Sequence, residues 1–303
     1  MKVLRLAIML FFACSTVASA AAEAKRFASL DDAVNALIDA LRSQDRRALA
    51  DILGPQGRIL VSSGDDVADR NAAQRFIAEY DKAHRLEGGG GKVVLYVGAD
   101  DFPFPIPLVP DGPSWRWDVD EGREEILRRR VGRNELSVIQ VCLAYVDAQR
   151  EYYSQSRGRD GILEYAQRFA SSPGKHDGLY WPTKGDEPPS PLGPLVMRAS
   201  AAGYARGSGS EKSGVPFHGY FYRILLRQGP SAPDGAYDYV TRGHMIGGFG
   251  LLAYPARYGD SGVMTFIVNH DGIVYQKDLG PATARVAAGI QSFDPDATWK
   301  RVD

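Results

Sequence analysis

Apolar residues in the first part of the chain recur every three to four positions. They are Ala33, Leu37 and Leu41 and, after a polar break, Leu49, Ile52 and Leu53. This interval places side chains on one face of an α-helix, and Ser29 stands where an N-cap is preferred. We therefore predict two consecutive helices. A third is predicted over residues 66–87, and four glycines at 88–91 bring it to an end.

After the glycines the pattern changes to short apolar runs. These runs occupy residues 92–98, 105–109 and 114–119, and as a set they are rich in the β-branched and aromatic residues that favour strands. Helices followed by an antiparallel sheet constitute an α+β unit, predicted here for residues 25–118. The order of elements is similar to that of small cystatin-like or nuclear-transport-factor-like domains.

Residues 120–155 combine a charged segment with a wide apolar one. The charged helix predicted at 120–131 has acidic residues first and arginines last, an order that complements the helix dipole. We therefore interpret the dense basic cluster at 126–133 as a solvated helix end. The longer helix that follows has two adjacent apolar stripes, which indicate burial against a sheet. One stripe comprises Leu136, Ile139, Leu143 and Val146, and the other comprises Val138, Val141, Cys142, Tyr145 and Tyr152.

The last part of the chain consists of an irregular segment and a set of strands. Residues 171–216 are rich in proline, glycine and serine, which predicts a long irregular loop after a short helix over 158–169. Strands are predicted at 217–226, 245–255, 262–269 and 272–280, and a helix at 281–290. We expect a second α+β domain over residues 119–303, in which the long helix packs on an antiparallel sheet.

Between the last two predicted strands lies the sequence Asn269-His270-Asp271-Gly272. Glycine after aspartate suits a tight hairpin connection with a positive φ angle. We predict either a two-residue turn or a three-residue loop with a glycine bulge, and both place His270 near the tip. On this interpretation Asp271 favours the turn by local hydrogen bonding, and the histidine is incidental.

The N-terminus has the features of a secretory leader. Two basic residues precede an apolar run that ends in small residues and is too short to cross a bilayer comfortably. We interpret residues 1–20 as a signal peptide, cleaved after Ala20 or near Ala24, and the protein as periplasmic or secreted. No later segment is apolar enough for a transmembrane span. An alternative is a lipoprotein anchored at Cys14, although the preceding residues lack the expected leucine-like side chain.

Charge and cysteine content narrow the class further. The formal net charge is −1 at pH 7, whereas nucleic-acid binders have a concentrated basic footprint, so no nucleic-acid partner is expected. Cys142 is the one cysteine outside the leader, which excludes an intramolecular disulfide. Stability must then come from an ordinary core, for which 44% hydrophobic residues suffice.

Three short motifs imitate functional sequences, and each has a structural explanation. Residues 259–262 spell GDSG, as around the nucleophile of chymotrypsin-like proteases, but no histidine stands in that family's context, and these are also turn residues. Residues 207–213 have a glutamate where a phosphate-binding loop requires glycine, and residues 88–92 precede a strand rather than a helix. We expect loops at all three places.

Candidate site residues lie in the second half of the chain. The five histidines show no metal-ligand spacing, so neither a metal site nor a cofactor is predicted, and no catalytic residue is assigned. His218 and His244 lie in the strand-rich part, where with Asp271 they could converge as a hydrolase site. Trp181, in the proline-rich loop, is a candidate binding contact because exposed aromatic side chains mark interaction surfaces.

Specific segments near the C-terminus carry a family resemblance. The motifs GYFYRIL, MIGGF, SGVMTF and DGIVYQKDLG resemble the bacterial envelope family called domain of unknown function 2950, over nearly all of the chain after the leader. The resemblance implies a secreted or periplasmic protein of unassigned activity. Residues Asn134, Glu135, Ala148, Gln149 and Tyr152 also resemble the helix of type IV pilin-like head domains, which implies a helix packed on an antiparallel sheet. The charged segment upstream departs from pilins, in which an apolar polymerising helix precedes the head.

Two hypotheses about function follow. The first is a noncatalytic envelope protein that binds or scaffolds another envelope protein or a surface polymer. The alternative is an envelope hydrolase whose site is assembled from the C-terminal histidines. The sequence favours a protein that is not an enzyme and leaves the question open.

Overall fold

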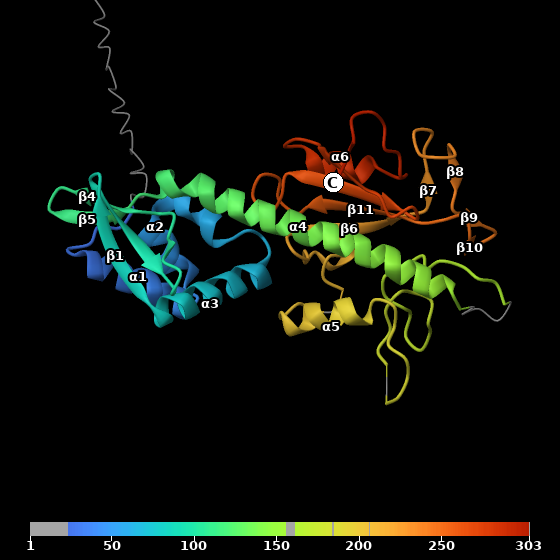
Figure 1. Ribbon diagram of the computed structural model, residues 1–303, viewed down its shortest axis with the longest axis horizontal. Helices are drawn as coiled ribbons and strands as arrows, with labels where there is room; N and C mark the ends of the chain where they lie inside the picture. The colour runs from blue at the N-terminus through green and yellow to red at the C-terminus, as the bar shows by residue number, and fades with distance from the viewer. Residues whose placement is uncertain (1–23, 156–160, 184, 206, 303) are drawn as a thin grey trace, which may run out of the picture.

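The chain folds into two lobes joined by one long helix (Figure 1). The computed structural model describes residues 24–155, 161–183, 185–205 and 207–302. Each lobe contains a five-stranded antiparallel sheet with helices packed on it, so the predicted α+β class is confirmed. The predicted signal peptide and Cys14 lie outside the described residues. Within the described ranges, none of the helices combines the length and the apolar character that a membrane span requires.

The N-terminal lobe packs three helices against its sheet. The helices are α1 (Leu30–Arg42), α2 (Arg46–Val61) and α3 (Asp66–Lys82). The strands are β1 (His84–Gly89), β2 (Lys92–Val97), β3 (Phe102–Pro103), β4 (Leu108–Asp111) and β5 (Ser114–Trp117). Ser29 caps α1 as predicted, because its side chain accepts a hydrogen bond from the backbone N–H of Asp32. The apolar stripe of α1, including Leu37, packs in one core with Leu95 and Trp117 of the sheet.

The third helix ends earlier than the sequence predicts. Helix α3 stops at Lys82, and β1 follows and pairs along its whole length with β2. Gly90 and Gly91, both with positive φ angles, form the turn between these strands. The glycine run therefore ends a strand and not a helix. Strand β1 is mostly exposed on both faces, so its sequence lacks the apolar alternation that would have identified it.

Helix α4 (Val119–Tyr153) contains 35 residues and runs along both lobes (Figure 1). At 1.5 Å per residue it is about 52 Å long. It contacts α2 in the N-terminal lobe and the sheet in the C-terminal lobe. The prediction of two separate helices is wrong, because Gly132 lies inside α4 without interrupting it. Only one of the two predicted stripes is wholly buried, since Leu136 and Leu143 of the other stripe are exposed.

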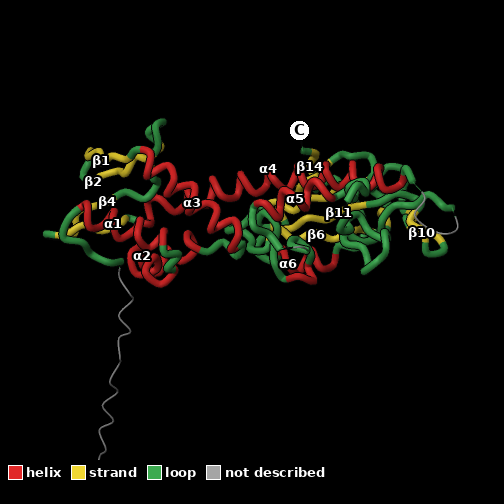
Figure 2. The backbone as a smooth tube through the Cα atoms, turned by 90° about the horizontal axis from the view of Figure 1, so that it is seen from below, coloured by secondary structure: helices red, strands yellow, loops and turns green. Residues whose placement is uncertain are grey.

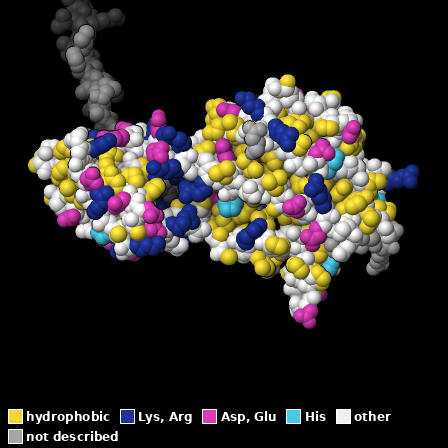
Figure 3. All heavy atoms as spheres, viewed as in Figure 1, with side chains coloured by type: hydrophobic (Ala, Val, Ile, Leu, Met, Phe, Trp, Pro, Cys, Tyr) yellow, Lys and Arg dark blue, Asp and Glu magenta, His cyan; other side chains and the backbone are white. Residues whose placement is uncertain are grey.

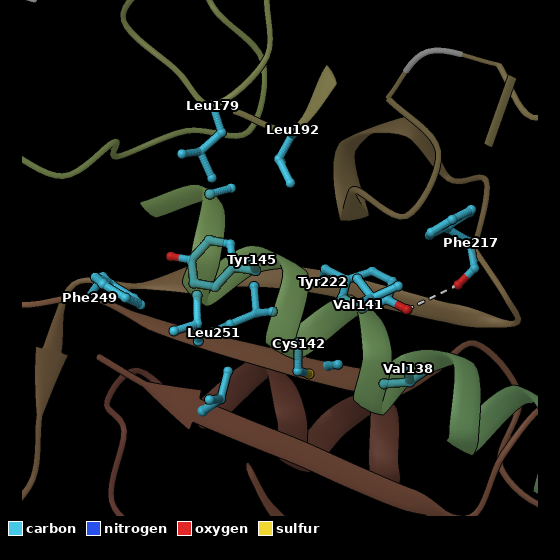
Figure 4. Packing of buried hydrophobic residues seen from close by; sticks show 14 of the residues in the cluster. Val138, Val141, Cys142, Tyr145, Leu179, Leu192, Phe217, Tyr222, Phe249 and Leu251 are labelled. Carbon is cyan, nitrogen blue, oxygen red and sulfur yellow. Dashed lines mark hydrogen bonds between the residues drawn. The ribbon is translucent and has the colours of Figure 1, made fainter. Parts of the chain in front are cut away.

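The C-terminal sheet has the strand order β14-β13-β12-β11-β6. Its strands are β6 (Tyr220–Leu225), β11 (Gly250–Pro255), β12 (Met264–Asn269), β13 (Val274–Asp278) and β14 (Lys300–Arg301). Neighbouring residues face opposite sides: Leu251 packs in the core under α4, and Leu252 packs with Ala287 of α6 (Thr283–Gly289). Helices α4 and α6 thus cover opposite faces of the sheet (Figure 2). Figure 4 shows Cys142 and Tyr145 of α4 in the buried cluster with Leu251.

The segment predicted as irregular contains some regular structure. Helix α5 (Gly193–Ala201) and the 3₁₀ turn η1 (Glu211–Ser213) lie within residues 171–216. The prolines around α5 concealed its short apolar pattern. Residues 161–169 form no helix, and 158–160 of that prediction lie outside the described residues. Two short strand pairs extend from the far end of the lobe: β7 (Arg227–Gln228) with β8 (Tyr237–Asp238), and β9 (Val240–Thr241) with β10 (His244–Met245).

The hairpin between β12 and β13 takes the longer of the two predicted forms. Gly272 has a φ of 80°, and its N–H donates to the carbonyl of Asn269 at 3.0 Å, as in a three-residue loop. The buried Asn269 side chain both donates to the Asp271 carboxylate and accepts from the Asp271 N–H. His270 is half-buried, with its ring edge-on to Tyr239. It is therefore not the incidental tip residue that the sequence indicated.

Candidate functional site

A cavity of about 920 Å³ lies where the two lobes meet. Its walls come from α1, α2, α3, the segment after β3, α4, and the C-terminal lobe at Ala202, Tyr204 and His218. In the space-filling view, a hollow between the lobes is bordered by Lys and Arg side chains (Figure 3). The volume lies at the upper end of the roughly 300–1,000 Å³ range that is usual for small-molecule sites. We call this space the interlobe cavity.

Apolar side chains of the N-terminal lobe and of α4 form one part of the lining of the interlobe cavity. We call this part the apolar floor; it comprises Leu37, Leu49, Leu53, Phe76, Phe104 and Ile126. Leu37, Leu49 and Leu53 also belong to the buried core of that lobe. The rings of Phe76 and Phe104 pack with their centroids 5.1 Å apart. Helical spacing on α1 and α2 thus directs apolar side chains both into the core and toward the cavity.

Arginine dominates the charged lining of the interlobe cavity. The arginines are Arg46, Arg70, Arg75, Arg129, Arg130 and Arg133, and the one acidic residue is Asp69. Three of the arginines form ion pairs, namely Arg46 with Asp66, Arg129 with Glu125 and Arg130 with Asp260. Asp69 accepts a hydrogen bond from the N–H of Ser63, and burial raises the pKa of its carboxyl group. The lining therefore carries an excess of positive charge.

Two of the remaining arginines line the interlobe cavity from different helices and interact electrostatically. Arg75 on α3 and Arg133 on α4, which we call the arginine pair, form no ion pair with any described residue. Burial, followed by the positive charges of Arg75 and Arg130, lowers the pKa of Arg133. Both side chains are exposed to solvent, which screens their repulsion in part, and a bound anion would offset the remainder.

The basic cluster of α4 has a different role from the one its sequence suggested. The sequence predicts a solvated helix end that complements the helix dipole, but the cluster lies inside α4, away from both ends, where the dipole acts weakly. The guanidinium of Arg130 donates to Asp260 and to the carbonyl of Leu60, and so fastens α4 to both lobes. Arg129 lies 4.5 Å above the ring of Phe102. The cluster is therefore part of the cavity wall.

The interlobe cavity is polar where it meets the C-terminal lobe. Asp65, only 1% exposed, caps α3 by accepting a hydrogen bond from the N–H of Ala68 at 3.0 Å. It also accepts hydrogen bonds from the Tyr204 hydroxyl at 2.8 Å and from the Gly219 N–H at 2.9 Å. Burial, with a contribution from the charge of Asp65, raises the pKa of Tyr204, so its hydroxyl stays protonated as a donor. One buried carboxylate thus joins the two lobes through neutral donors.

His218, a predicted site residue, lies at this polar end. Its ring packs against Phe217 and Tyr204, with centroid distances of 4.2 and 5.8 Å. Burial lowers the pKa of His218, so the imidazole is neutral at pH 7. The nearby carboxylate of Asp65 is already engaged by three neutral donors, so it does not orient the imidazole as a catalytic triad requires.

The structure does not bring His218, His244 and Asp271 together. His218 precedes β6 at the end of the sheet where Tyr220 pairs with Pro255. Asp271 follows β12 at the opposite end, where Asn269 pairs with Gly250. His244 lies in β10 at the far end of the lobe (Figure 1), where its ring is 3.1 Å from Glu164. Residues at opposite ends of the strands cannot share one reacting group, so no hydrolase site is assembled from these three.

Trp181 is buried rather than exposed. Its exposed fraction is 6%, and its ring stacks on His176 with the centroids 4.3 Å apart. The loop that carries it is held against α4, because the Tyr152 hydroxyl donates to the carbonyl of His176 at 2.9 Å. Trp181 is therefore not an exposed binding contact. Its large ring fills the core and stabilises the fold by burying apolar area.

The other motif-like segments are structural. In the part of the chain that the structure describes, no group of three or more His, Cys, Asp or Glu residues is arranged to hold a metal ion. In the GDSG segment, the Ser261 hydroxyl bonds to the backbone of Arg257, and Asp260 is the partner of Arg130. These contacts stabilise a turn, as its composition predicts.

Sequence reasoning missed the arginine pair. Arg133 belongs to the basic cluster that was noticed, but Arg75 lies on another helix, and periodicity alone does not show which helices face each other. The density of the basic cluster was a signal that could have found the pair. Arg128 and Arg129 both form ion pairs with Glu125. Arg130 and Arg133 have no acidic residue three or four positions before them on the helix.

Comparisons with known proteins identify a family without an assigned activity. The family model described as a protein of unknown function (DUF2950) matches residues 24–302. No curated protein matches the chain. No solved structure matches it either.

Proposed function

The chain belongs to the family of domain of unknown function 2950, and we propose that within this family it is a noncatalytic binding protein of the cell envelope. Its ligand site is the interlobe cavity. The observation that carries the proposal is the cavity itself, a space of about 920 Å³ with an apolar floor, a few placed polar groups and walls from both lobes. Concave, mostly apolar sites with a small number of polar groups are typical of small-molecule binding.

Binding rather than catalysis is supported by the engagement of the two buried carboxylates where the lobes meet. The carboxylate of Asp65 is engaged by three neutral donors, and Asp260 is paired with Arg130. A general base needs a free acceptor within reach of its substrate. Asp65 and Asp260 instead hold the lobes together and so stabilise the shape of the cavity.

Export from the cytoplasm is the second part of the proposal. It rests on the basic, apolar and small-residue order of residues 1–20. Mass spectrometry of the protein recovered from the envelope fraction should find a new N-terminus after Ala20 or near Ala24. An intact Met1, or a lipid on Cys14, would contradict this.

Filling the cavity tests the binding proposal directly. Ala72 on α3 lines the interlobe cavity, whereas Ala78 on the same helix is exposed and does not line it. We expect the small-molecule fraction of an envelope extract to raise the melting temperature of the wild-type protein and of Ala78→Trp, and to have no effect on Ala72→Trp. Equal responses from the two variants, or no response from the wild type, would overturn the proposal.

A further inference from the structure

We propose that the ligand of the interlobe cavity is an anionic amphiphile with a single acyl chain, whose carboxylate or phosphate head lies between Arg75 and Arg133. This inference rests on the proposed function and adds the chemical class of the ligand. A carboxylate and a phosphate are both compact anions, and both accept hydrogen bonds from guanidinium in the same way.

The shape of the interlobe cavity fits a molecule with two unlike ends. Its apolar floor extends into the N-terminal core, where Leu37, Leu49 and Leu53 are buried side chains. Polar groups of Asn134, Ser137 and Tyr204 also line the cavity. An apolar chain gains free energy only where water is excluded, so it belongs in the floor, and a charged head belongs beside the polar and basic groups of the lining.

The charge of the cavity selects the sign of the head. The arginine pair has no partner among the described acidic residues, and the pKa of Arg133 is lowered by burial and by its cationic neighbours. Arginine presents several N–H donors in a fixed fork that suits a carboxylate or phosphate. A cationic head would bring further positive charge toward guanidinium groups that already repel one another. The site therefore favours a net anion.

The arginine pair is available to a ligand because other groups hold the lobes together. Arg130 is bonded to Asp260 and Leu60, and Asp65 is bonded to Tyr204 and Gly219. Arg75 and Arg133 contribute no ion pair to that connection. Replacing either arginine should leave the fold intact and relieve like-charge repulsion.

Equilibrium binding of defined probes, measured by calorimetry, tests the inference. The probes are palmitate, monopalmitoyl glycerol phosphate, neutral monopalmitoylglycerol and inorganic phosphate. We expect one of the two anionic amphiphiles to bind at least about tenfold more tightly than the neutral one, since a charge-assisted hydrogen bond supplies that factor. Affinity should fall as salt rises. The ranking of palmitate against monopalmitoyl glycerol phosphate identifies the head as carboxylate or phosphate. Binding of inorganic phosphate as tight as that of the amphiphiles would overturn the role of the apolar floor.

Matched variants locate the charge. Arg75→Gln and Arg133→Gln should each weaken binding of the anionic probe by about tenfold without changing that of monopalmitoylglycerol. Arg133→Lys, which keeps the charge and loses the fork, should restore part of the affinity. The control is Arg47→Gln, because Arg47 is an exposed arginine of α2 that does not line the cavity. Unfolding curves of all variants check that each is folded.

The outcomes separate this inference from the function on which it rests. If neutral and anionic probes bind equally, or if Arg47→Gln weakens binding as much as Arg133→Gln, the anionic head is wrong and the cavity remains a binding site. If the defined probes do not bind but the extract fraction still stabilises the wild type and not Ala72→Trp, only the ligand class is wrong. If neither the probes nor the extract bind, both proposals fail.

Discussion

Single buried residues reinforce the connection that α4 makes between the two lobes. Asp65 illustrates this, because its one carboxylate caps α3, accepts the Tyr204 hydroxyl and accepts the Gly219 N–H. A buried carboxylate is costly to desolvate, and three hydrogen-bond donors offset that cost here. The residue thus couples the start of one helix to the sheet of the other lobe.

Removing this carboxylate should be more costly than removing one of its donors. Asp65→Ala leaves two donors buried without an acceptor, at about 1–3 kcal/mol each, and removes a helix cap worth about 1 kcal/mol. We expect a loss of about 3 kcal/mol or more in the free energy of unfolding. Tyr204→Phe removes one hydrogen bond and should cost about 1 kcal/mol. Urea unfolding of both variants measures the difference, and equal losses would show that the carboxylate is not the shared acceptor.

His218 should make stability depend on pH. Burial lowers its pKa from the ordinary 6.5, so the unfolded chain binds the proton more readily than the folded one. The stability associated with the neutral ring is therefore present above pH 6.5 and is lost as the pH falls through the lowered pKa. Urea unfolding between pH 8 and pH 5 should show a smaller decrease for His218→Gln than for the wild type. An identical decrease would assign the effect to other groups.

The β12–β13 hairpin gives a third test at this scale. Gly272 has a positive φ, and a branched residue there should cost about 1–3 kcal/mol. His270 packs on Tyr239 and Phe249, so His270→Ala should exceed the roughly 0.5 kcal/mol of a surface substitution. Thermal unfolding of Gly272→Val and His270→Ala checks both values. A negligible effect of His270→Ala would restore the view that the histidine is incidental.

Among the elements, α4 shows best what the sequence could and could not predict. Its apolar stripe and the strands of the C-terminal sheet follow from periodicity, because buried faces repeat at 3.6 and 2 residues. The continuity of α4 through Gly132 could not be predicted from the sequence, because a glycine within a charged segment is also typical of a break between two helices. The exposed strand β1 buries no regular face and so lacks an apolar pattern, whereas the short apolar pattern of α5 was concealed by the surrounding prolines.

The candidate site was even less accessible from the sequence. His218 was identified, but through its residue type and its place in the strand-rich region. Its neighbour Tyr204 and the arginine pair come from segments far apart along the chain, and only the packing of α3, α4 and the C-terminal lobe brings them to one cavity. Long-range packing of this kind leaves no local pattern.

Two glycines of α4 should respond in opposite directions to the same substitution. A Cβ at Gly132 would meet no atom within 4 Å, so Gly132→Ala should stabilise the protein by about 0.5–1 kcal/mol through helix propensity. A Cβ at Gly122 would lie 2.5 Å from the carbonyl oxygen of Pro105 and 2.7 Å from Ile106, so Gly122→Ala should destabilise it by about 1–3 kcal/mol. Chemical denaturation compares the pair. A destabilising Gly132→Ala would indicate that α4 bends there.

At the scale of the whole molecule, the lobes share structure instead of meeting as independent units. Helix α4 contributes to both, and Val67 of α3 lies in the core cluster of the C-terminal lobe. Hydrogen bonds also connect the lobes. The Asn71 side chain donates to the carbonyl of Ala202 at 2.9 Å, and the Arg257 guanidinium donates to the carbonyl of Ser62 at 3.1 Å. Such contacts couple the unfolding of one lobe to that of the other.

Dividing the chain at the start of α4 tests this coupling. A fragment of residues 118–303 keeps the sheet and its core, so it should fold, but it lacks Asp65 and the N-terminal packing of α4. We expect it to unfold at a lower temperature than the chain from residue 25 onward, which should unfold in one calorimetric transition. Two separate transitions in the longer chain, one at the temperature of the fragment, would show that the lobes are independent.

The burial of Cys142, on the side of α4 that faces the sheet, makes this residue a native probe of core opening. Its side chain is fully enclosed, and burial raises the pKa of the thiol to about 12. Only the thiolate attacks disulfides. In the folded molecule this sulfur is therefore protected because reagents cannot reach it and because it stays protonated. Modification by a disulfide reagent must then wait until α4 lifts from the sheet. The labelling rate of the native thiol thus reports how often the C-terminal core opens, with no engineered cysteine required.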